Sequence, residues 1–179
     1  SEIEVELIFD DKELDLNTRE ADIGIWMRRP KKLNYIHRKL IDLKYHMYGS
    51  NKYLEKHGYP KTVNDLNKHK FISYGKGAPS PVFNPDWALK LGMKDNKKRK
   101  SVMKVNSIMG LLLAVESGVG IAALPDYLVS LSSNLIKLMP SEEGPITEAY
   151  FVYPESLKNV ARVQVFRNFL YSKISEWKF

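Results

Sequence analysis

Residues with catalytic potential are few in this sequence and lie far apart. The four histidines, His37, His46, His57 and His69, show none of the short spacings that bring metal ligands together. Residues Ser117–Gly120 lack the Gly-x-Ser-x-Gly pattern of a nucleophilic serine, and their two glycines precede a predicted strand instead of following one, which argues against a dinucleotide site. The sequence therefore predicts a protein that is not an enzyme and that holds no metal and no cofactor.

A polar pair at a predicted strand-to-helix junction is the best candidate for ligand binding. Asn106 and Ser107 follow an alternating strand pattern and precede an apolar helical pattern. In open α/β sheets, ligands bind beyond the carboxyl ends of the strands, where the N-terminus of the next helix offers free N–H groups. Asn106 can donate and accept hydrogen bonds, and Ser107 either caps its helix, contacts a ligand or does both.

The composition is that of an ordinary globular protein. A chain of 179 residues forms one domain or two small lobes, and 44% hydrophobic with 27% charged residues is typical of a packed fold. The longest apolar run, residues 108–115, is too short to span a bilayer. The first residues are acidic and alternating, unlike a signal peptide, so we expect a cytoplasmic protein with no membrane partner. The absence of cysteine excludes disulfides and cysteine metal sites.

The net charge of +7 raises the possibility of nucleic-acid binding. The basic residues concentrate in two short runs, 28–32 and 97–100, each within a polar connector and without aromatic residues between the charges. Solvated loop charge explains such runs better than a phosphate-binding surface. We therefore expect no DNA binding by this chain itself.

Hydrophobic periodicity predicts an α/β chain. Residues 3–9 alternate between glutamate and apolar side chains, as in a strand with one wet face, and 21–26 reads as a second, buried strand. Further strands are predicted at 35–41, 43–48, 71–74, 102–106, 119–124, 135–138 and 149–153, and helices at 50–57, 62–69, 87–91, 107–117 and 160–174. Ser50 is a predicted N-cap, and Gly58 and Gly118 are predicted C-terminal stops.

Four stretches, in this order, resemble the effector-domain pattern of LysR-type transcription regulators. The first is an acidic turn and strand at 14–25 that contains Arg-Glu-Ala-Asp, and the second is the Tyr-Leu…Gly-x-Pro…Asp-Leu…His pattern of 48–69. The third joins Asn106 and Ser107 to the Gly-x-Gly-Ile-x-x-Leu-Pro pattern of 118–125, and the fourth is Tyr153-Pro154 with the closing helix. Together they span nearly the whole chain.

This resemblance implies a fold like that of type 2 periplasmic binding proteins, with two Rossmann-like lobes joined by two crossover strands. Lobe I would comprise 1–47 and 147–179, and lobe II would comprise 48–146. By the family pattern, the winged helix-turn-helix, the linker helix and the first strand and helix of lobe I are expected to be missing from this chain.

The resemblance also implies an effector site between the lobes. Ile25, Trp26 and Met27 match one wall of that site, and Trp26 would either stack on a flat ligand or pack within its lobe. Tyr48 and Ser73 are weaker contact candidates beside Asn106 and Ser107. Arg28 would pair with the carboxylate of an anionic effector if it faces the site, or remain a solvated loop charge.

The implied function is that of a small-molecule sensor. Effector binding would alter DNA binding by the N-terminal domain of the full-length protein, which would be a homo-oligomer, a dimer or a tetramer, and would contact DNA through that domain only. A solute-binding protein of a transporter with the same fold is the alternative. The identity of the effector is not legible in the sequence.

Overall fold

The structure, a computed structural model, describes residues 3–10, 13–31, 33–75, 84, 86–95, 97–130, 132 and 134–177. The chain forms two compact units. Unit 1 comprises Ser1–Asp42 and Thr147–Lys178, and unit 2 is built from Leu43–Ile146. The chain thus passes from one unit to the other twice, once after residue 42 and once after residue 146.

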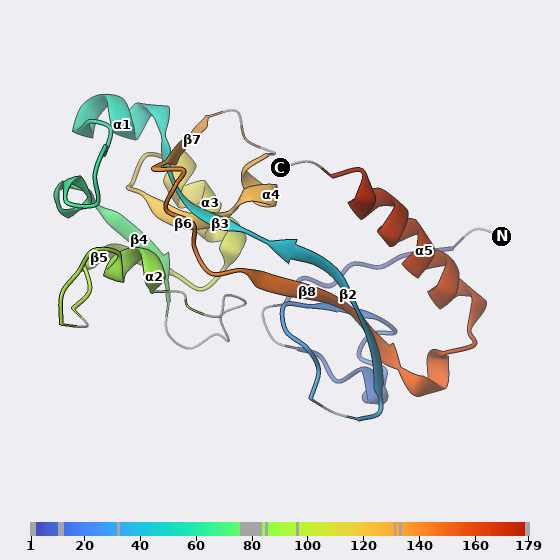
Figure 1. Ribbon diagram of the computed structural model, residues 1–179. Coiled ribbons are helices and arrows are strands. Elements are labelled where there is room, and N and C mark those ends of the chain that lie inside the picture. The colour runs from blue at the N-terminus through green and yellow to red at the C-terminus, as the bar shows by residue number, and fades with distance from the viewer. Residues whose placement is uncertain are drawn as a thin grey trace. The chain divides into compact units, whose positions relative to one another are not determined.

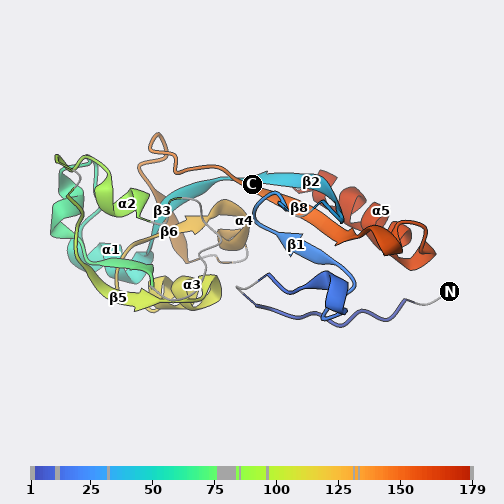
Figure 2. The same cartoon turned by 90° about the horizontal axis from the view of Figure 1, so that it is seen from below.

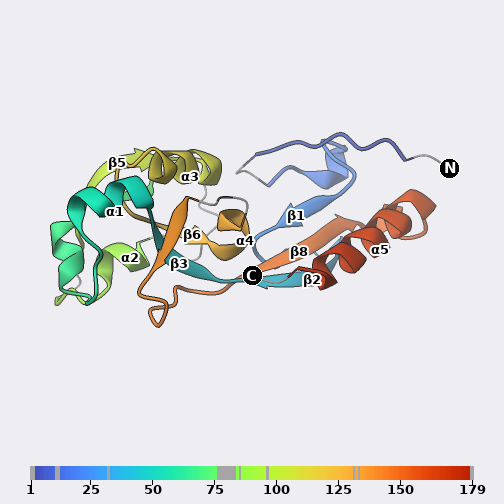
Figure 3. The same ribbon diagram turned by 90° about the horizontal axis from the view of Figure 1, so that it is seen from above.

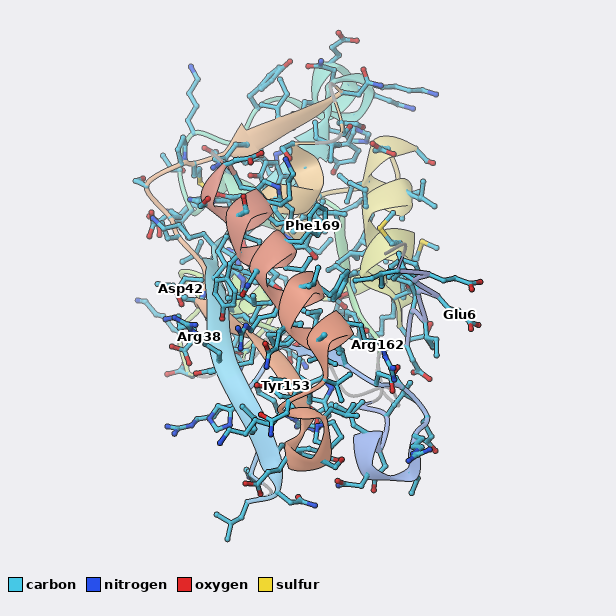
Figure 4. The ribbon with its side chains drawn as sticks, turned by 90° about the vertical axis from the view of Figure 1, so that its right-hand side faces the viewer. Glu6, Arg38, Asp42, Tyr153, Arg162 and Phe169 are labelled. Atoms are coloured by element: carbon cyan, nitrogen blue, oxygen red, sulfur yellow. The ribbon has the colours of Figure 1, made fainter. Side chains whose placement is uncertain are left out.

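Unit 1 is a three-stranded sheet with one long helix. The strand order is β1 (Gly24–Trp26), β8 (Thr147–Pro154) and β2 (Tyr35–Leu43), and β1 runs antiparallel to β8. Two short 3-10 helices, η1 (Leu16–Thr18) and η3 (Glu155–Leu157), flank the strands. Helix α5 (Ala161–Ser175) lies along β2 and β8 (Figures 2 and 4).

Side chains on β8 alternate between two small cores, as a strand period of two requires. Phe151 and Tyr153 pack with Val163, Phe166 and neighbouring side chains under α5. The intervening β8 residues pack on the other face with Leu16 and Trp26. Both faces of β8 are therefore buried.

Unit 2 contains two sheets. In the first, β3 (Tyr45–Ser50) lies between β6 (Ala122–Pro125) and β7 (Leu135–Leu138), antiparallel to both. The second is a parallel pair, β4 (Phe71–Tyr74) and β5 (Ser101–Val105). The helices of this unit are α1 (Asn51–His57), η2 (Asp65–Lys68), α2 (Trp87–Lys90), α3 (Ile108–Glu116) and α4 (Asp126–Val129) (Figures 1 and 3).

The close approach of two backbones links the sheets of unit 2. Phe71 forms an isolated parallel bridge with Ile121, whose N–H donates to the carbonyl of Lys70 at 2.9 Å. A Cβ on Gly120 would lie 2.3 Å from that same carbonyl oxygen, so only glycine permits this contact. The second glycine of the Gly-x-Gly pattern thus has a packing role.

The predicted helix boundaries at caps are confirmed. The side chains of Ser50 and Ser107 accept hydrogen bonds from the backbone N–H groups of Tyr53 and Gly110. Gly58 caps the C-terminus of α1, and Gly118 follows α3 with φ of 79°, the left-handed conformation expected of a C′ glycine. The serine caps and the glycines therefore determine where α1 and α3 begin and end.

Three predicted elements differ from the structure. Residues 3–10 form no strand, because no described strand pairs with them, and their apolar side chains are exposed. The strand predicted at 21–26 covers only Gly24–Trp26 and is partly exposed instead of buried. The helix predicted at 62–69 is only one 3-10 turn, η2, and before it Asp65 accepts from the Thr62 N–H at 2.9 Å.

Candidate functional site

The ends of β4 and β5 lie side by side, because parallel neighbours place their carboxyl ends at the same edge. The N–H of Gly75 donates to the carbonyl of Val105 at 2.7 Å, and the Tyr74 hydroxyl donates to the carbonyl of Asn106 at 2.9 Å. These bonds hold Tyr74 and Gly75 against Val105 and Asn106, at the ends of the two strands. Three predicted site residues, Ser73, Asn106 and Ser107, are thereby brought to one end of one sheet.

Ser107 performs the capping role predicted for it. Its backbone is extended, at φ −138° and ψ 135°, and its Oγ lies 3.4 Å from the N–H of Gly110. The other free N–H groups at the start of α3 give this end of the helix a partial positive charge. Asn106, immediately before the cap, is exposed. Direct contact of Asn106 and Ser107 with a ligand stays a prediction.

Behind these strand ends is a small, mostly apolar cavity. Its volume is about 20 Å³, room for roughly one water. Ser73 lines it, and the Ser73 Oγ also lies 2.6 Å from the Ser101 Oγ. The remaining lining residues are Tyr45, Phe71, Ile72, Tyr74, Trp87, Ala88, Leu89, Ile108, Leu111 and Ala123. A larger ligand group would enter only if some of these side chains moved.

Trp87 lines this cavity and carries an unsatisfied buried donor. The side chain is 9% exposed, and its Nε1 finds no acceptor among the described residues. A buried N–H without an acceptor costs about 1–3 kcal/mol. This nitrogen faces Gly144, which does not line the cavity. Sequence reasoning assigned Trp87 only to a helical turn, because a lone tryptophan carries no motif.

Tyr48 belongs to a buried polar network. It is 3% exposed, and its hydroxyl donates to Asp126 at 2.7 Å. His46 Nδ1 lies 2.8 Å from the same carboxylate, and Lys137 Nζ lies 3.0 Å from its other oxygen. Asp126 and Lys137 were not among the predicted site residues. Asp126 directly follows β6 and Lys137 lies within β7, and neither carries a sequence motif.

The network sets the ionisation of its members. Burial of the Asp126 carboxyl opposes its ionisation, but hydrogen bonds from His46, Tyr48 and Lys137 together hold its pKa below the usual value. Burial, and then the hydrogen bond to Asp126, raise the pKa of the Tyr48 hydroxyl. Asp126 therefore stays charged and Tyr48 stays protonated at neutral pH.

The three predicted effector contacts in unit 1, Ile25, Trp26 and Met27, are consecutive residues at the end of β1. Ile25 is 45% exposed, and Met27 is half-buried. The ring of Trp26 meets that of Tyr35 edge-on at 5.3 Å between centroids, and it lies against the backbone of Gly24. Trp26 therefore packs within its own unit, and its predicted contact with a ligand remains a prediction.

Two arginines in the basic runs are engaged within the protein. Arg28 pairs with Glu13, which raises the pKa of the arginine. Arg99 donates to the carbonyls of Leu91 and Val63 at 2.7 and 3.2 Å, and its guanidinium lies over the Phe71 ring. The interpretation of run 97–100 as solvated loop charge is thus wrong for Arg99, which ties together three segments of unit 2.

Among the described residues, no group of three or more histidine or acidic side chains has a geometry that fits a metal ion. No described helix has both the length and the apolar character needed to cross a membrane.

Comparisons with known proteins identify the class. A family model described as the LysR substrate binding domain matches residues 1–174. This chain belongs to that family, and the predicted family and α/β fold class are confirmed. The chain is 28% identical over 156 residues to a protein of Haemophilus influenzae described as an uncharacterised HTH-type transcriptional regulator. The match covers 85% of this chain and 53% of that relative, so the chain spans about half the relative's length.

Solved structures show the same fold. The regulatory domain of CrgA, a LysR-type regulator from Neisseria meningitidis, matches with a TM-score of 0.76 at 24% identity over 90% of this chain and 79% of that chain. Full-length AphB of Vibrio cholerae matches with a TM-score of 0.67 at 18% identity over 96% of this chain and 58% of that chain. The AmpR effector domain of Pseudomonas aeruginosa matches with a TM-score of 0.66 at 13% identity over 93% and 78%. The match to the family model favours the regulator over the transporter alternative, which shares this fold.

Proposed function

We propose that this chain is the effector-sensing part of a LysR-type transcription regulator and that a small molecule bound to it changes DNA binding by another region of the whole protein. The family match over residues 1–174 is the observation that carries the proposal. A DNA-reading part outside this chain is supported by the relative, which is described as a helix-turn-helix-type regulator and is matched over 53% of its length.

Units 1 and 2 are, in this proposal, the two lobes of the sensor. The predicted lobe boundaries at 47/48 and 146/147 lie near the unit boundaries at 42/43 and 146/147. Because a ligand that binds two conformations unequally shifts the equilibrium between them, effector binding would act by favouring one arrangement of the lobes.

On unit 2, the effector would contact the paired ends of β4 and β5. Asn106 is exposed there, Ser107 caps α3, and Ser73 lines the small, mostly apolar cavity. This arrangement favours an effector with a hydrogen-bond acceptor or anionic group and an apolar part. Ile25, Trp26 and Met27 of unit 1 and Tyr48 of unit 2 remain proposed contacts.

We propose that the chain performs no catalysis. His46 and Asp126 form the arrangement most like a general base with its orienting carboxylate. Their hydrogen bonds, and those of Tyr48 and Lys137, are made to one another inside unit 2, which supports a structural role. No cofactor is required by the proposed sensing role. A regulator that acts on bacterial DNA would work in the cytoplasm, and its full-length form would be a homo-oligomer.

DNA binding would belong to the region outside this chain. In the run 97–100, Arg99 is engaged internally and Lys98 pairs with Asp86 at 2.8 Å, which leaves fewer free charges than the sequence suggests. A gel-shift assay tests whether DNA binding belongs to the region outside this chain. This chain should not shift DNA at low salt, whereas the complete gene product should. Salt-sensitive binding by this chain alone would contradict the proposal.

A thermal-shift screen of small metabolites tests the sensing role. A ligand present at about 100 times its Kd stabilises the folded state by about 2.7 kcal/mol. We expect at least one metabolite to raise the melting temperature of this chain. A helix-turn-helix encoded upstream of Ser1 supports the regulator, whereas a secretion signal there would support the transporter alternative and contradict it.

A further inference from the structure

A buried tyrosine of unit 2 contacts two histidines. Tyr53 of α1 is 2% exposed, and its ring stacks on that of His57 at 4.2 Å between centroids and meets that of His69 at 5.8 Å. The Tyr53 hydroxyl accepts from the backbone N–H of Lys70 at 2.8 Å. These contacts, which we name the Tyr53 joint, tie α1 to the C-cap of η2 and to the residue before β4 (Figure 1).

The Tyr53 joint continues into the sheets of unit 2. The carbonyl of Lys70 accepts from the N–H of Ile121 at 2.9 Å, next to the start of β4. The same strand carries Ser73, which lines the cavity at the candidate site. A movement at the joint would therefore act on the strand that positions Ser73.

The two histidines differ in their hydrogen bonding. His57 is exposed, and its Nδ1 donates to the carbonyl of Tyr53 at 2.9 Å. The Nδ1 of His69 is buried and has no hydrogen-bond partner among the described residues. A neutral imidazole can keep its one proton on Nε2, whereas a protonated ring carries N–H on both nitrogens. Protonation of His69 would thus place a charged N–H where it meets no acceptor.

The groups around His69 also oppose its protonation. Burial lowers the pKa of the ring most, and the nearby His57 of α1 lowers it further. On η2, Asp65 raises this pKa and Lys68 lowers it, and the two side chains lie 3.8 Å apart. The Tyr53 hydroxyl stays uncharged, because burial raises its pKa. The pKa of His69 in the folded chain therefore lies below its ordinary value of 6.5.

We propose that His69 is an acid-sensitive switch, whose ring takes up a proton in mild acid and leaves the Tyr53 joint, so that the start of β4 loosens. Opening exposes the ring to water, where it binds a proton with its ordinary affinity. The joint is therefore fully stable above pH 6.5, the ordinary pKa of the ring, and loses stability as the pH falls from there. The proton would be an input to unit 2 that acts without any effector, which goes beyond the proposed function.

Amide hydrogen exchange of the chain 1–179, read by NMR, tests the switch. The N–H groups of Lys70 and Ile121 report on the joint, and the N–H of Glu155, which donates to Asn34 in unit 1, is the reference. Each exchange rate is divided by the intrinsic rate at the same pH, so that protection is compared. Between about pH 7.5 and about pH 5.5, the reporters should lose protection at least about threefold, and the reference should lose less.

Three variants assign the response to one ring. His69→Gln removes the titrating group, so the reporter amides should lose most of their pH response. His37→Gln is the matched control, because His37 also has a buried Nδ1 without a partner among the described residues but lies in unit 1. Its response should equal that of the wild type. His57→Gln removes a group that lowers the pKa of His69, so the response should become smaller without disappearing.

An NMR titration of the histidine rings measures the pKa of His69 directly in the wild type and needs no variant to fold. We expect a pKa below 6.5. A pKa of 6.5 or higher would overturn the inference. A pH response of the reporter amides that persists in His69→Gln would overturn it too, because another group would then control the joint.

Discussion

The Nδ1 atom of His46 lies 2.8 Å from a carboxylate oxygen of Asp126, and both side chains are buried. His46 is on β3 and Asp126 begins α4, so this contact joins the central strand of unit 2 to a helix some 80 residues later in the chain. Lys137 on β7 reaches the same carboxylate. One acidic side chain therefore links three elements of the unit.

Asp126→Asn should strongly destabilise the chain. Removing one partner of a buried charge network leaves the remaining donors without a charged acceptor, at a cost of about 3–5 kcal/mol. Urea denaturation followed by circular dichroism measures the free energy of unfolding. Asp86→Asn is the control, because its exposed pair with Lys98 should contribute less than about 1 kcal/mol. Equal losses in the two variants would contradict the structural role of the network.

The same network predicts a pH dependence of stability. The folded pKa of Asp126 is held below its unfolded value, which is about 3.9. Its stabilising contribution is therefore complete above that unfolded value and is lost as the pH falls through the folded pKa. Between pH of about 5 and about 2.5, the free energy of unfolding should fall more in the wild type than in Asp126→Asn. If the free energy of unfolding fell equally in the wild type and in Asp126→Asn, other carboxyl groups would be the cause of the loss of stability in acid.

Arg99→Ala should also destabilise unit 2. The guanidinium donates to backbone carbonyls of two segments and to the Asn67 side chain, and these acceptors would lose a charged donor, at about 1.5–3 kcal/mol for each such bond. Lys98→Ala, the neighbouring exposed lysine, should cost less than about 1 kcal/mol. Thermal unfolding of the two variants side by side measures the difference, and similar melting temperatures would show that Arg99 is not structural.

Gly120→Ala tests the close approach of β4 and the chain before β6. The added Cβ would lie 2.3 Å from the Lys70 carbonyl oxygen, so the backbones would have to separate and the flanking hydrogen bonds to Ile121 would weaken. We expect a loss of about 2 kcal/mol or more, as for other overpacked sites. Gly58→Ala is the matched comparison, since a Cβ there meets no atom within 4 Å, although its φ of 85° disfavours alanine. If Gly120→Ala lowered the free energy of unfolding less than Gly58→Ala does, the packing role of Gly120 would be contradicted.

Local chemistry made much of the fold predictable. Ser50, Ser107 and Gly118 each act through their immediate neighbours, so the limits of α1 and α3 follow from the sequence. Residues 3–9 carry an equally clear strand pattern and form no strand, because a strand exists only with a partner and alternation does not name one. Periodicity therefore predicts helices more directly than it predicts paired strands.

The candidate site was predictable only where strand order determines it. Ser73 and Asn106 come together because Ser73 lies near the end of β4 and Asn106 follows β5, the two strands of one parallel pair. Asp126, Lys137 and Trp87 carry no motif, and their roles arise from contacts between residues far apart in the chain. Arg99 was hidden inside a basic run, since the sequence does not distinguish a solvated charge from one that points inward.

Calorimetric titration of the first ligand found by thermal shift tests the sensing proposal most directly. The double variant Asn106→Ala with Ser107→Ala should remain folded, lose about 1 kcal/mol of stability from the cap, and bind that ligand at least tenfold more weakly. Ser50→Ala, which removes the cap of α1 in the same unit, should leave the affinity unchanged. Unchanged affinity in the double variant would show that the effector does not bind at the ends of β4 and β5.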